Sequence, residues 1–244
     1  MMRDSQNRGR GLVLDKSDIQ ETLVSLYLRL NGYFVSGFIV HAAWRAGTEI
    51  DVLAIRFPWQ KEPAREVLPD DRLGISAGHV DFIIGEVKGG QGNVNFNIGF
   101  RGEEAAVRSV LERFGAFSDD EMDRVCGLVP KILEPRSLQR QLSFPELEVV
   151  LGDAAGKQKG ILRFVPFAAE QRRSNGPSRP YIFEDDLLGF IWKCFRPDKP
   201  RGDCDVRYNF ELWGPQFVEL VRYFKDRSRD RPGTIEDIYR TYGV

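Results

Sequence analysis

The segment Val80–Lys88 (VDFIIGEVK) constrains the fold of this chain more than any other part of the sequence. Its β-branched and aromatic residues predict a strand, and the apolar or small positions Phe82–Gly85 indicate that this strand is buried. The strand ends in Glu86 and Lys88, which lie two positions apart and therefore project from the same face. Burying such a pair for stability alone gains little, because desolvation offsets the Coulomb attraction. We therefore expect this pair to have a functional role.

A second apolar segment, Glu49–Arg56 (EIDVLAIR), contains an aspartate at position 51. Aspartate is a poor strand former and is costly to bury unless it is paired, hydrogen-bonded or bound to a metal. If the two strands are neighbours, Asp51 and Glu86 converge. Two close carboxylates favour a divalent cation, and oxygen ligands without histidine or thiolate favour Mg²⁺ or Mn²⁺. Glu49 shares the face of Asp51 by strand parity, and is either a further acid of the site or a solvent-facing charge.

The other elements are predicted from apolar periodicity and turn residues. Ser17 and Gln20 have the spacing of a capping box, and Asn31-Gly32 supplies a left-handed stop, so a helix is expected between them. The further expected strands are Tyr33–His41, Glu146–Leu151 and Ile161–Phe167, and the further expected helices are Glu103–Phe114, one after Ser118, Phe183–Phe195, Gly214–Phe224 and Thr234–Tyr242. The resulting order, αβββαβ followed by helices, predicts an α/β fold.

Composition narrows the class of protein. No apolar run approaches the roughly 18 residues that a membrane span needs, and the first residues lack the apolar stretch of a secretory signal. Three cysteines, at spacings that match neither a zinc site nor a disulfide framework, fit a reducing compartment, so we expect a soluble, cytoplasmic protein. The net charge of -1 gives by itself no case for a nucleic-acid partner. Basic residues, Arg172 and Arg173 among them, gather in the second half of the chain, as solvated faces or as nucleic-acid contacts.

The segments GTEIDVLAIR and VDFIIGEVKGG together resemble the signature of the PD-(D/E)XK nuclease superfamily, and the αβββαβ order is similar to its common core. The resemblance covers about Ser17–Leu151. It implies a restriction-endonuclease-like core with a central mixed sheet flanked by helices. It also implies that Asp51 and Glu86 are metal ligands, that Lys88 is the catalytic lysine, and that the backbone carbonyl of Val87 is a further ligand.

Members similar to archaeal Holliday-junction resolvases and Mrr-type restriction proteins place a glutamate of the first helix near the metal, and Glu21 has the matching position here. The chain departs from the common pattern in having no proline before Asp51. The implied activity is a Mg²⁺- or Mn²⁺-dependent endonuclease acting on DNA. Because double-strand cleavage by this fold commonly needs two sites, a homodimer is also implied.

Three alternatives stay open. The first is a catalytically inactive nucleic-acid-binding protein of the same fold, the second an RNA-directed nuclease, and the third a hydrolase in which two carboxylates act as general acid and base without a metal. Asn93 and Asn95, which alternate just after Lys88, either touch a sugar-phosphate backbone or form loop hydrogen bonds. The expected organisation is a polar leader (1–16), the nuclease core (17–151), and a fifth strand with a helical C-terminal extension packed on the core (152–244).

Overall fold

The computed structural model describes residues 14–40, 48–60, 67–134, 143–152, 158–173, 180–196, 214–226 and 228–244. The strands are β1 (Phe34–Val40), β2 (Thr48–Arg56), β3 (Val80–Lys88), β4 (Glu146–Leu151), β5 (Gln158–Ala168) and β6 (Ile182–Phe183). The helices are α1 (Lys16–Leu30), α2 (Ile98–Gly102), α3 (Glu104–Phe114), α4 (Asp119–Ile132), α6 (Glu184–Phe195), α8 (Val218–Lys225) and α9 (Ile235–Tyr242), with short 3₁₀ turns η1 (Asp71–Leu73) and η3 (Pro215–Phe217). Most of the expected leader and the end of the first expected strand, His41, lie outside the described residues.

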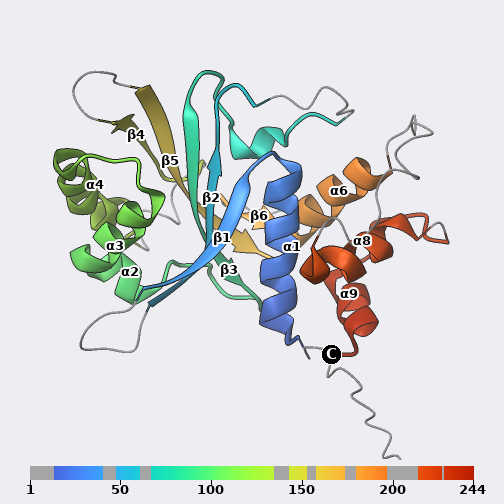
Figure 1. The fold of residues 1–244 in the computed structure, drawn as a ribbon. Coiled ribbons are helices and arrows are strands. Elements are labelled where there is room, and N and C mark those ends of the chain that lie inside the picture. Colours follow the sequence, from blue (N-terminus) through green and yellow to red (C-terminus); the bar gives the residue numbers. More distant parts are fainter. Residues whose placement is uncertain are drawn as a thin grey trace, which may run out of the picture.

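One mixed sheet separates two layers of helices (Figure 1). On one face, α1 and the C-terminal helices α6, α8 and α9 share a core with sheet residues such as Val52 and Ile83. On the other face, α3 and α4 share a second core with Ile50, Leu53 and Phe82. The predicted α/β organisation, with a mixed sheet flanked by helices, is confirmed. Within the described ranges, no helix has the length and apolar character needed to cross a membrane.

Strand β3 lies in the middle of the sheet, in the order β1-β2-β3-β5-β4 with β6 beside β5. It pairs antiparallel with β2 and parallel with β5, and every residue of it except Lys88 is buried, which explains its near-continuous apolar sequence. Gly85 is required at its centre, because a Cβ there would lie 2.9 Å from the Phe167 ring and 3.1 Å from Val52. Strand β5, which follows residue 151, is thus an inner strand of the sheet.

Strand β2 contains a bulge at the position of Asp51. Ser36 pairs with Leu53 and Phe38 pairs with Ile50, so two steps on β1 match three steps on β2, and Asp51 and Val52 together oppose one residue. Val52 packs on the α1 side of the sheet, whereas Ile50 and Leu53 pack on the other side. The bulge therefore lets β2 keep its apolar residues buried on both faces while Asp51 is turned out of the regular ladder.

The start of α1 differs from the prediction. Asp15 is the N-cap, and it forms a reciprocal capping box with Asp18 through hydrogen bonds of 3.0 and 2.9 Å. The predicted box of Ser17 and Gln20 is wrong, because the Ser17 hydroxyl donates to Glu21 and the Gln20 side chain is buried in contacts with other elements. The predicted end at Asn31-Gly32 is correct, with Gly32 at a φ of +87°.

The segment after Lys88 also holds an unpredicted element. Asn97 caps the short helix α2 by accepting a 2.9 Å hydrogen bond from the backbone N–H of Gly99. The five residues of α2 are too few for their apolar periodicity to stand out from the surrounding glycines and asparagines. The predicted cap at Ser118 is present and begins α4.

Candidate functional site

Glu86 and Lys88 form an ion pair at the end of β3, with 2.6 Å between Nζ of Lys88 and Oε1 of Glu86. Their contact agrees with the parity of the strand. The Glu86 side chain is 1% exposed and the Lys88 side chain 47% exposed, so the carboxylate lies inside the protein and the ammonium group reaches solvent. The pair thus presents the positive charge of Lys88 at the surface, and the buried carboxylate of Glu86 holds it in place.

Asp51 approaches the same place from β2. The last pair of the β2–β3 ladder is Val52 with Gly85, and beyond it the Asp51 carboxylate accepts a 2.6 Å hydrogen bond from the backbone N–H of Val87. Burial, followed by the negative charge of Asp51, raises the pKa of Glu86 to about 7. The two strands are neighbours, as the sequence hypothesis required, and Asp51 and Glu86 lie close enough to act on one another's charge.

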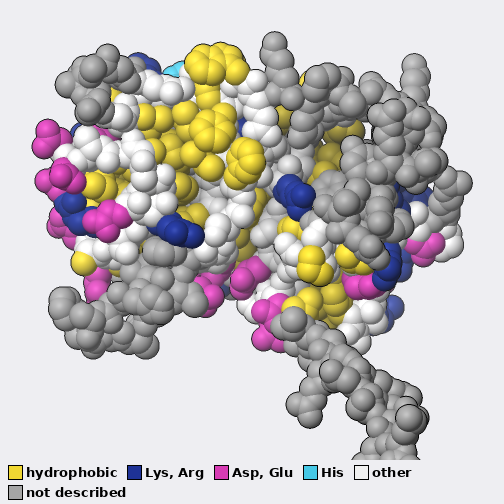
Figure 2. Space-filling model, viewed as in Figure 1, with side chains coloured by type: hydrophobic (Ala, Val, Ile, Leu, Met, Phe, Trp, Pro, Cys, Tyr) yellow, Lys and Arg dark blue, Asp and Glu magenta, His cyan; other side chains and the backbone are white. Residues whose placement is uncertain are grey.

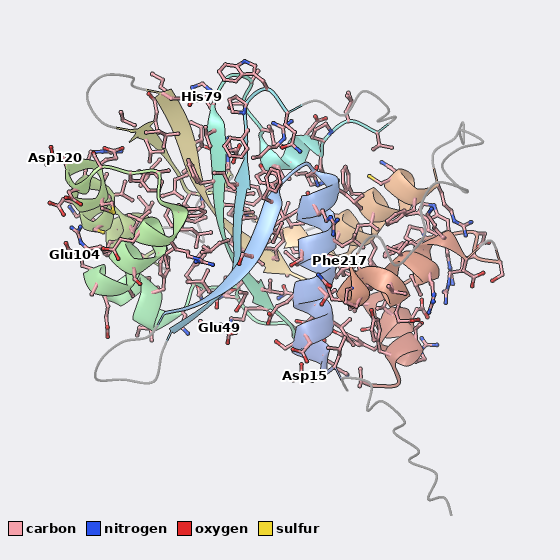
Figure 3. All side chains as sticks on the ribbon, viewed as in Figure 1. Asp15, Glu49, His79, Glu104, Asp120 and Phe217 are labelled. Atoms are coloured by element: carbon pink, nitrogen blue, oxygen red, sulfur yellow. The ribbon has the colours of Figure 1, made fainter. Side chains whose placement is uncertain are left out.

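Glu21 joins the site from α1. It lines one groove together with Asp51, and its carboxylate accepts a 3.4 Å hydrogen bond from the Ser17 hydroxyl. Burial, followed by the charges of Asp51 and Glu49, raises the pKa of Glu21 to about 7. Figure 3 shows Glu49 low on β2, on the side toward α1. Glu49 is solvent-exposed, and its negative charge acts to raise the pKa of both Glu21 and Asp51.

Lys88 is the positive centre of this group. Burial alone would lower its pKa, but Glu86, and after it Asp51 and Glu21, raise the pKa overall. The lysine therefore stays protonated at neutral pH. The four residues expected to form one site, Glu21, Asp51, Glu86 and Lys88, are brought together from three different elements.

The oxygen donors of the site have features that both limit and favour the binding of a divalent cation. Among the described residues, no group of three or more His, Cys, Asp or Glu side chains is close enough to hold a metal ion. Mg²⁺, however, commonly keeps several waters and takes one or two protein carboxylates, which Asp51 and Glu86 supply. Oε2 of Glu86 is buried and has no hydrogen-bond partner within 3.5 Å among the described residues, although the nearby backbone of Asn97 acts to lower the pKa of this carboxyl. Because an unpaired buried carboxylate oxygen is costly, this atom fits the position of a cation ligand.

A polar network supports the loop that follows Lys88. Glu170, just after β5, accepts hydrogen bonds from the backbone N–H of Gly90 (2.5 Å), from the side chain of Gln20 (3.0 Å) and from the hydroxyl of Tyr239 (2.7 Å). Gln20 also donates to the Tyr239 hydroxyl at 2.6 Å. A Cβ on Gly89 would lie 2.8 Å from the Gln20 amide, so a larger residue there would displace the Gln20 side chain. The network ties α1, β5 and α9 to the backbone beside the site.

Sequence reasoning missed this network, and no local signal would have found it. Glu170 is 150 residues from Gln20 and 69 residues from Tyr239, and neither pair forms a motif. Each residue taken alone has an ordinary place in its helix or turn. Their association follows from the packing of α9 against the rest of the molecule, which periodicity does not predict.

The other residues expected to contact nucleic acid are two arginines and two asparagines. Arg172 pairs with Glu184 at 3.5 Å and Arg173 pairs with Asp186 at 2.7 Å, so both arginines hold the first turn of α6. The residues that line the groove of Asp51 and Glu21 include neither Asn93 nor Asn95. Asn93 is exposed and Asn95 is half-buried, in the loop before α2.

Comparisons of this chain with protein-family models, with curated proteins and with solved structures each find no match.

Proposed function

We propose that this chain is a divalent-metal-dependent endonuclease that hydrolyses phosphodiester bonds in DNA. The observation that carries the proposal is the meeting of Asp51, Glu86 and Lys88 where β2 and β3 separate, with Glu86 buried beneath the exposed lysine. A carboxylate pair with an adjacent lysine is what the PD-(D/E)XK resemblance implies. The chain order is α1, β1, β2 and β3, followed by helices and further strands. This order supports a restriction-endonuclease-like fold, because it is similar to the αβββαβ core that the resemblance implies.

In this proposal Asp51 and Glu86 would hold Mg²⁺ or Mn²⁺, with the backbone carbonyl of Val87 as a further oxygen donor. Glu21 is not close enough to complete a group of three carboxylate ligands with them, so it would act through one of the waters that Mg²⁺ keeps. When bound, the cation lowers the pKa of water and offsets phosphate charge. The hydrogen bond from Val87 N–H fixes one oxygen of Asp51 and leaves the other available. Of the two carboxylates, Glu86 is the more deeply buried, so it gains more from a cation's charge.

Hydrolysis joins a water oxygen to phosphorus, breaks the bond from phosphorus to the leaving sugar oxygen, and delivers a proton to that oxygen. Lys88 contributes a fixed positive charge, which can hold the attacking water or stabilise the charge that develops on the phosphate. Its position is set by the 2.6 Å contact with Glu86. A lysine without this contact would lose side-chain order on a solvent-exposed strand end.

The test is cleavage of plasmid and of single-stranded DNA with Mg²⁺ or Mn²⁺. We expect the wild type to cut and Lys88→Ala to lose activity. Lys159→Ala is a matched control, because Lys159 of β5 forms a similar ion pair with Glu148 of β4, with 2.5 Å between Nζ and Oε1, and both side chains are exposed. The proposal fails if the wild type binds DNA but cuts none with either metal, which would favour an inactive nucleic-acid-binding protein.

Two further measurements separate the remaining alternatives. Calorimetry should detect Mg²⁺ or Mn²⁺ binding that Glu86→Gln abolishes, whereas a metal-free acid–base pair would show no such binding. A parallel assay with RNA distinguishes an RNA-directed nuclease. Sedimentation of the free and DNA-bound chain tests the proposed homodimer, since concerted double-strand cleavage by one active site per chain requires two copies.

A further inference from the structure

Three aromatic side chains stand together at the end of β1 and β2 that lies away from Asp51. Phe34, Phe57 and Trp59 are 62%, 50% and 75% exposed, and we name them the aromatic platform. Phe34 pairs with Ile55, and Phe57 follows two positions later on the same face, so the two rings meet with centroids 6.1 Å apart. Figure 2 shows hydrophobic side chains gathered over the upper part of this face.

Folding does not account for this grouping. Single exposed apolar residues are common on protein surfaces, but a cluster of large rings indicates a contact site. Trp59 lies in the turn closed by the hydrogen bond from the Gln60 N–H to the Phe57 carbonyl, at 3.2 Å. The turn therefore holds the indole outward instead of packing it on the sheet.

A groove of about 700 Å³ extends from Phe34, the one platform residue that lines it, to Asp51 and Glu21. Phe34 and Gln60 line one end of it, and Asp51 and Glu21 line the other. Between them runs one face of α1, on which Glu21, Ser25 and Arg29 recur every four residues. From residue 21 to residue 29 the helix advances about 12 Å, at 1.5 Å per residue. The platform and the site are thus two ends of one surface.

The groove presents the groups that contact a sugar-phosphate backbone. The hydroxyl and amide side chains that line it are Thr22, Ser25, Ser36, Gln60 and Gln216. The guanidinium of Arg29 lies 5.4 Å from the centroid of the Phe217 ring, which is labelled beside α1 in Figure 3. Hydroxyl, amide and guanidinium donors are those that proteins use to bind phosphate and sugar. The charged residues that line the groove are three acids, Asp18, Glu21 and Asp51, and one base, Arg29, which lies toward the platform.

We propose that the aromatic platform stacks unpaired bases of a nucleic-acid strand whose backbone follows α1 to Glu21 and Asp51. The substrate then contains a single-stranded segment. In a duplex the base faces are already stacked on one another and only base edges are accessible, so rings such as Trp59 can stack only on unpaired bases. The polar lining of the groove argues against an apolar protein segment as the occupant. That the nucleic-acid strand leads to a cleavage site rests on the proposed function, whereas its binding at the platform does not.

The experiment measures fluorescence anisotropy of a labelled oligothymidylate and of a duplex of the same length, in EDTA so that no cleavage occurs. We expect the wild type to bind the single strand more tightly than the duplex. Trp59→Ala should weaken single-strand binding about 5- to 150-fold, the equivalent of one lost stacking contact, and Phe34→Ala should act in the same direction. Leu68→Ala is the control, because Leu68 is 81% exposed and lies beside α6.

The proposal is overturned if Trp59→Ala binds the oligothymidylate as the wild type does, if the duplex binds more tightly, or if the wild type does not bind the single strand. A cleavage assay with Mg²⁺ on the same variants separates this inference from the proposed function. Platform-dependent binding without cleavage retains the inference and removes the nuclease. Cleavage and oligothymidylate binding that are both unchanged in Trp59→Ala retain the nuclease and remove the inference.

Discussion

The backbone N–H of Val87 donates a 2.6 Å hydrogen bond to the carboxylate of Asp51. This contact extends the pairing of β2 and β3 past their last ladder pair, with a side chain in place of a backbone carbonyl. It also places an acid of β2 directly beside the residue that lies between Glu86 and Lys88. The same carboxylate therefore has a structural contact and a position in the proposed site, and substitutions can separate the two.

Asp51→Asn and Asp51→Ala should differ in stability and agree in activity. Asparagine keeps an oxygen that can accept from Val87 N–H, so we expect a free energy of unfolding close to that of the wild type. Alanine leaves this N–H without its acceptor and should cost about 1 to 3 kcal/mol. Both variants should lose metal binding and cleavage. Urea denaturation with calorimetry checks this, and equal stability of the two variants would contradict the role of the hydrogen bond.

Stability should fall as pH rises across the range in which Glu86 titrates. Burial and the charge of Asp51 raise the pKa of Glu86 from 4.5 to about 7. Between these values the folded protein binds a proton that the unfolded chain has released, so the free energy of unfolding decreases with pH. Above a pH of about 7 the Glu86 carboxylate is charged in both the folded and the unfolded chain, and the folded protein bears the full cost of burying this charge. Glu21 is raised in the same way and adds to the slope.

Glu86→Gln should flatten this dependence, because the amide does not titrate. We expect the variant to gain stability relative to the wild type at pH 8 and to gain little at pH 4. Thermal or urea unfolding across this range, without added metal, provides the measurement. Parallel curves for the two proteins would show that Glu86 carries no burial penalty, and the interpretation of its unpaired oxygen would then be wrong.

Much of the fold follows from local pattern. The bounds of β3 and β4 are those predicted, and β2, α3 and α9 differ from the prediction by one residue, because their apolar periodicity and flanking turns are local signals. The meeting of Glu86 with Lys88 follows from strand parity. The sequence hypothesis required β2 and β3 to be neighbours but could not predict it, and in the structure the two strands pair directly.

The rest depends on contacts between distant segments. The bulge at Asp51 has no sequence signature, since its neighbours Ile50 and Val52 are ordinary strand residues. The choice between two capping boxes at the start of α1 is decided by Gln20, whose side chain is bound by Glu170 and Tyr239 and is therefore not available as a cap. Rules based on neighbouring residues cannot predict a contact between two residues that are 150 positions apart in the sequence.

Tyr239→Phe should slow cleavage without weakening DNA binding. The Tyr239 hydroxyl bonds Glu170 and Gln20, and Glu170 in turn holds the backbone of Gly90 beside Lys88. Tyr239 acts through these partners, so we expect kcat to fall several-fold while KM is unchanged. Amide hydrogen exchange at residues 89–92 should become faster, because the loop loses part of its support.

The matched control is Tyr223→Phe, which removes a 3.1 Å hydrogen bond to the Pro232 carbonyl and leaves the network of Glu170 intact. It should lower stability without changing kcat or exchange at residues 89–92. Equal losses of kcat in both tyrosine variants would indicate a general loss of stability and would exclude a positioning role for Tyr239.

Alanine should have opposite effects on stability at Gly85 and at Gly127. At Gly85 a Cβ would lie 2.9 Å from Phe167 and 3.1 Å from Val52, and both neighbours are fixed in the buried core, so overpacking should cost about 1 to 3 kcal/mol. Gly127 lies on the exposed face of α4 with no atom within 4 Å of a new Cβ, and alanine there should add about 0.5 to 1 kcal/mol. Urea denaturation measures both changes. A stable Gly85→Ala protein would mean that β2, β3 and β5 can separate at this point, and the close approach of Asp51 to Glu86 would then lose its structural basis.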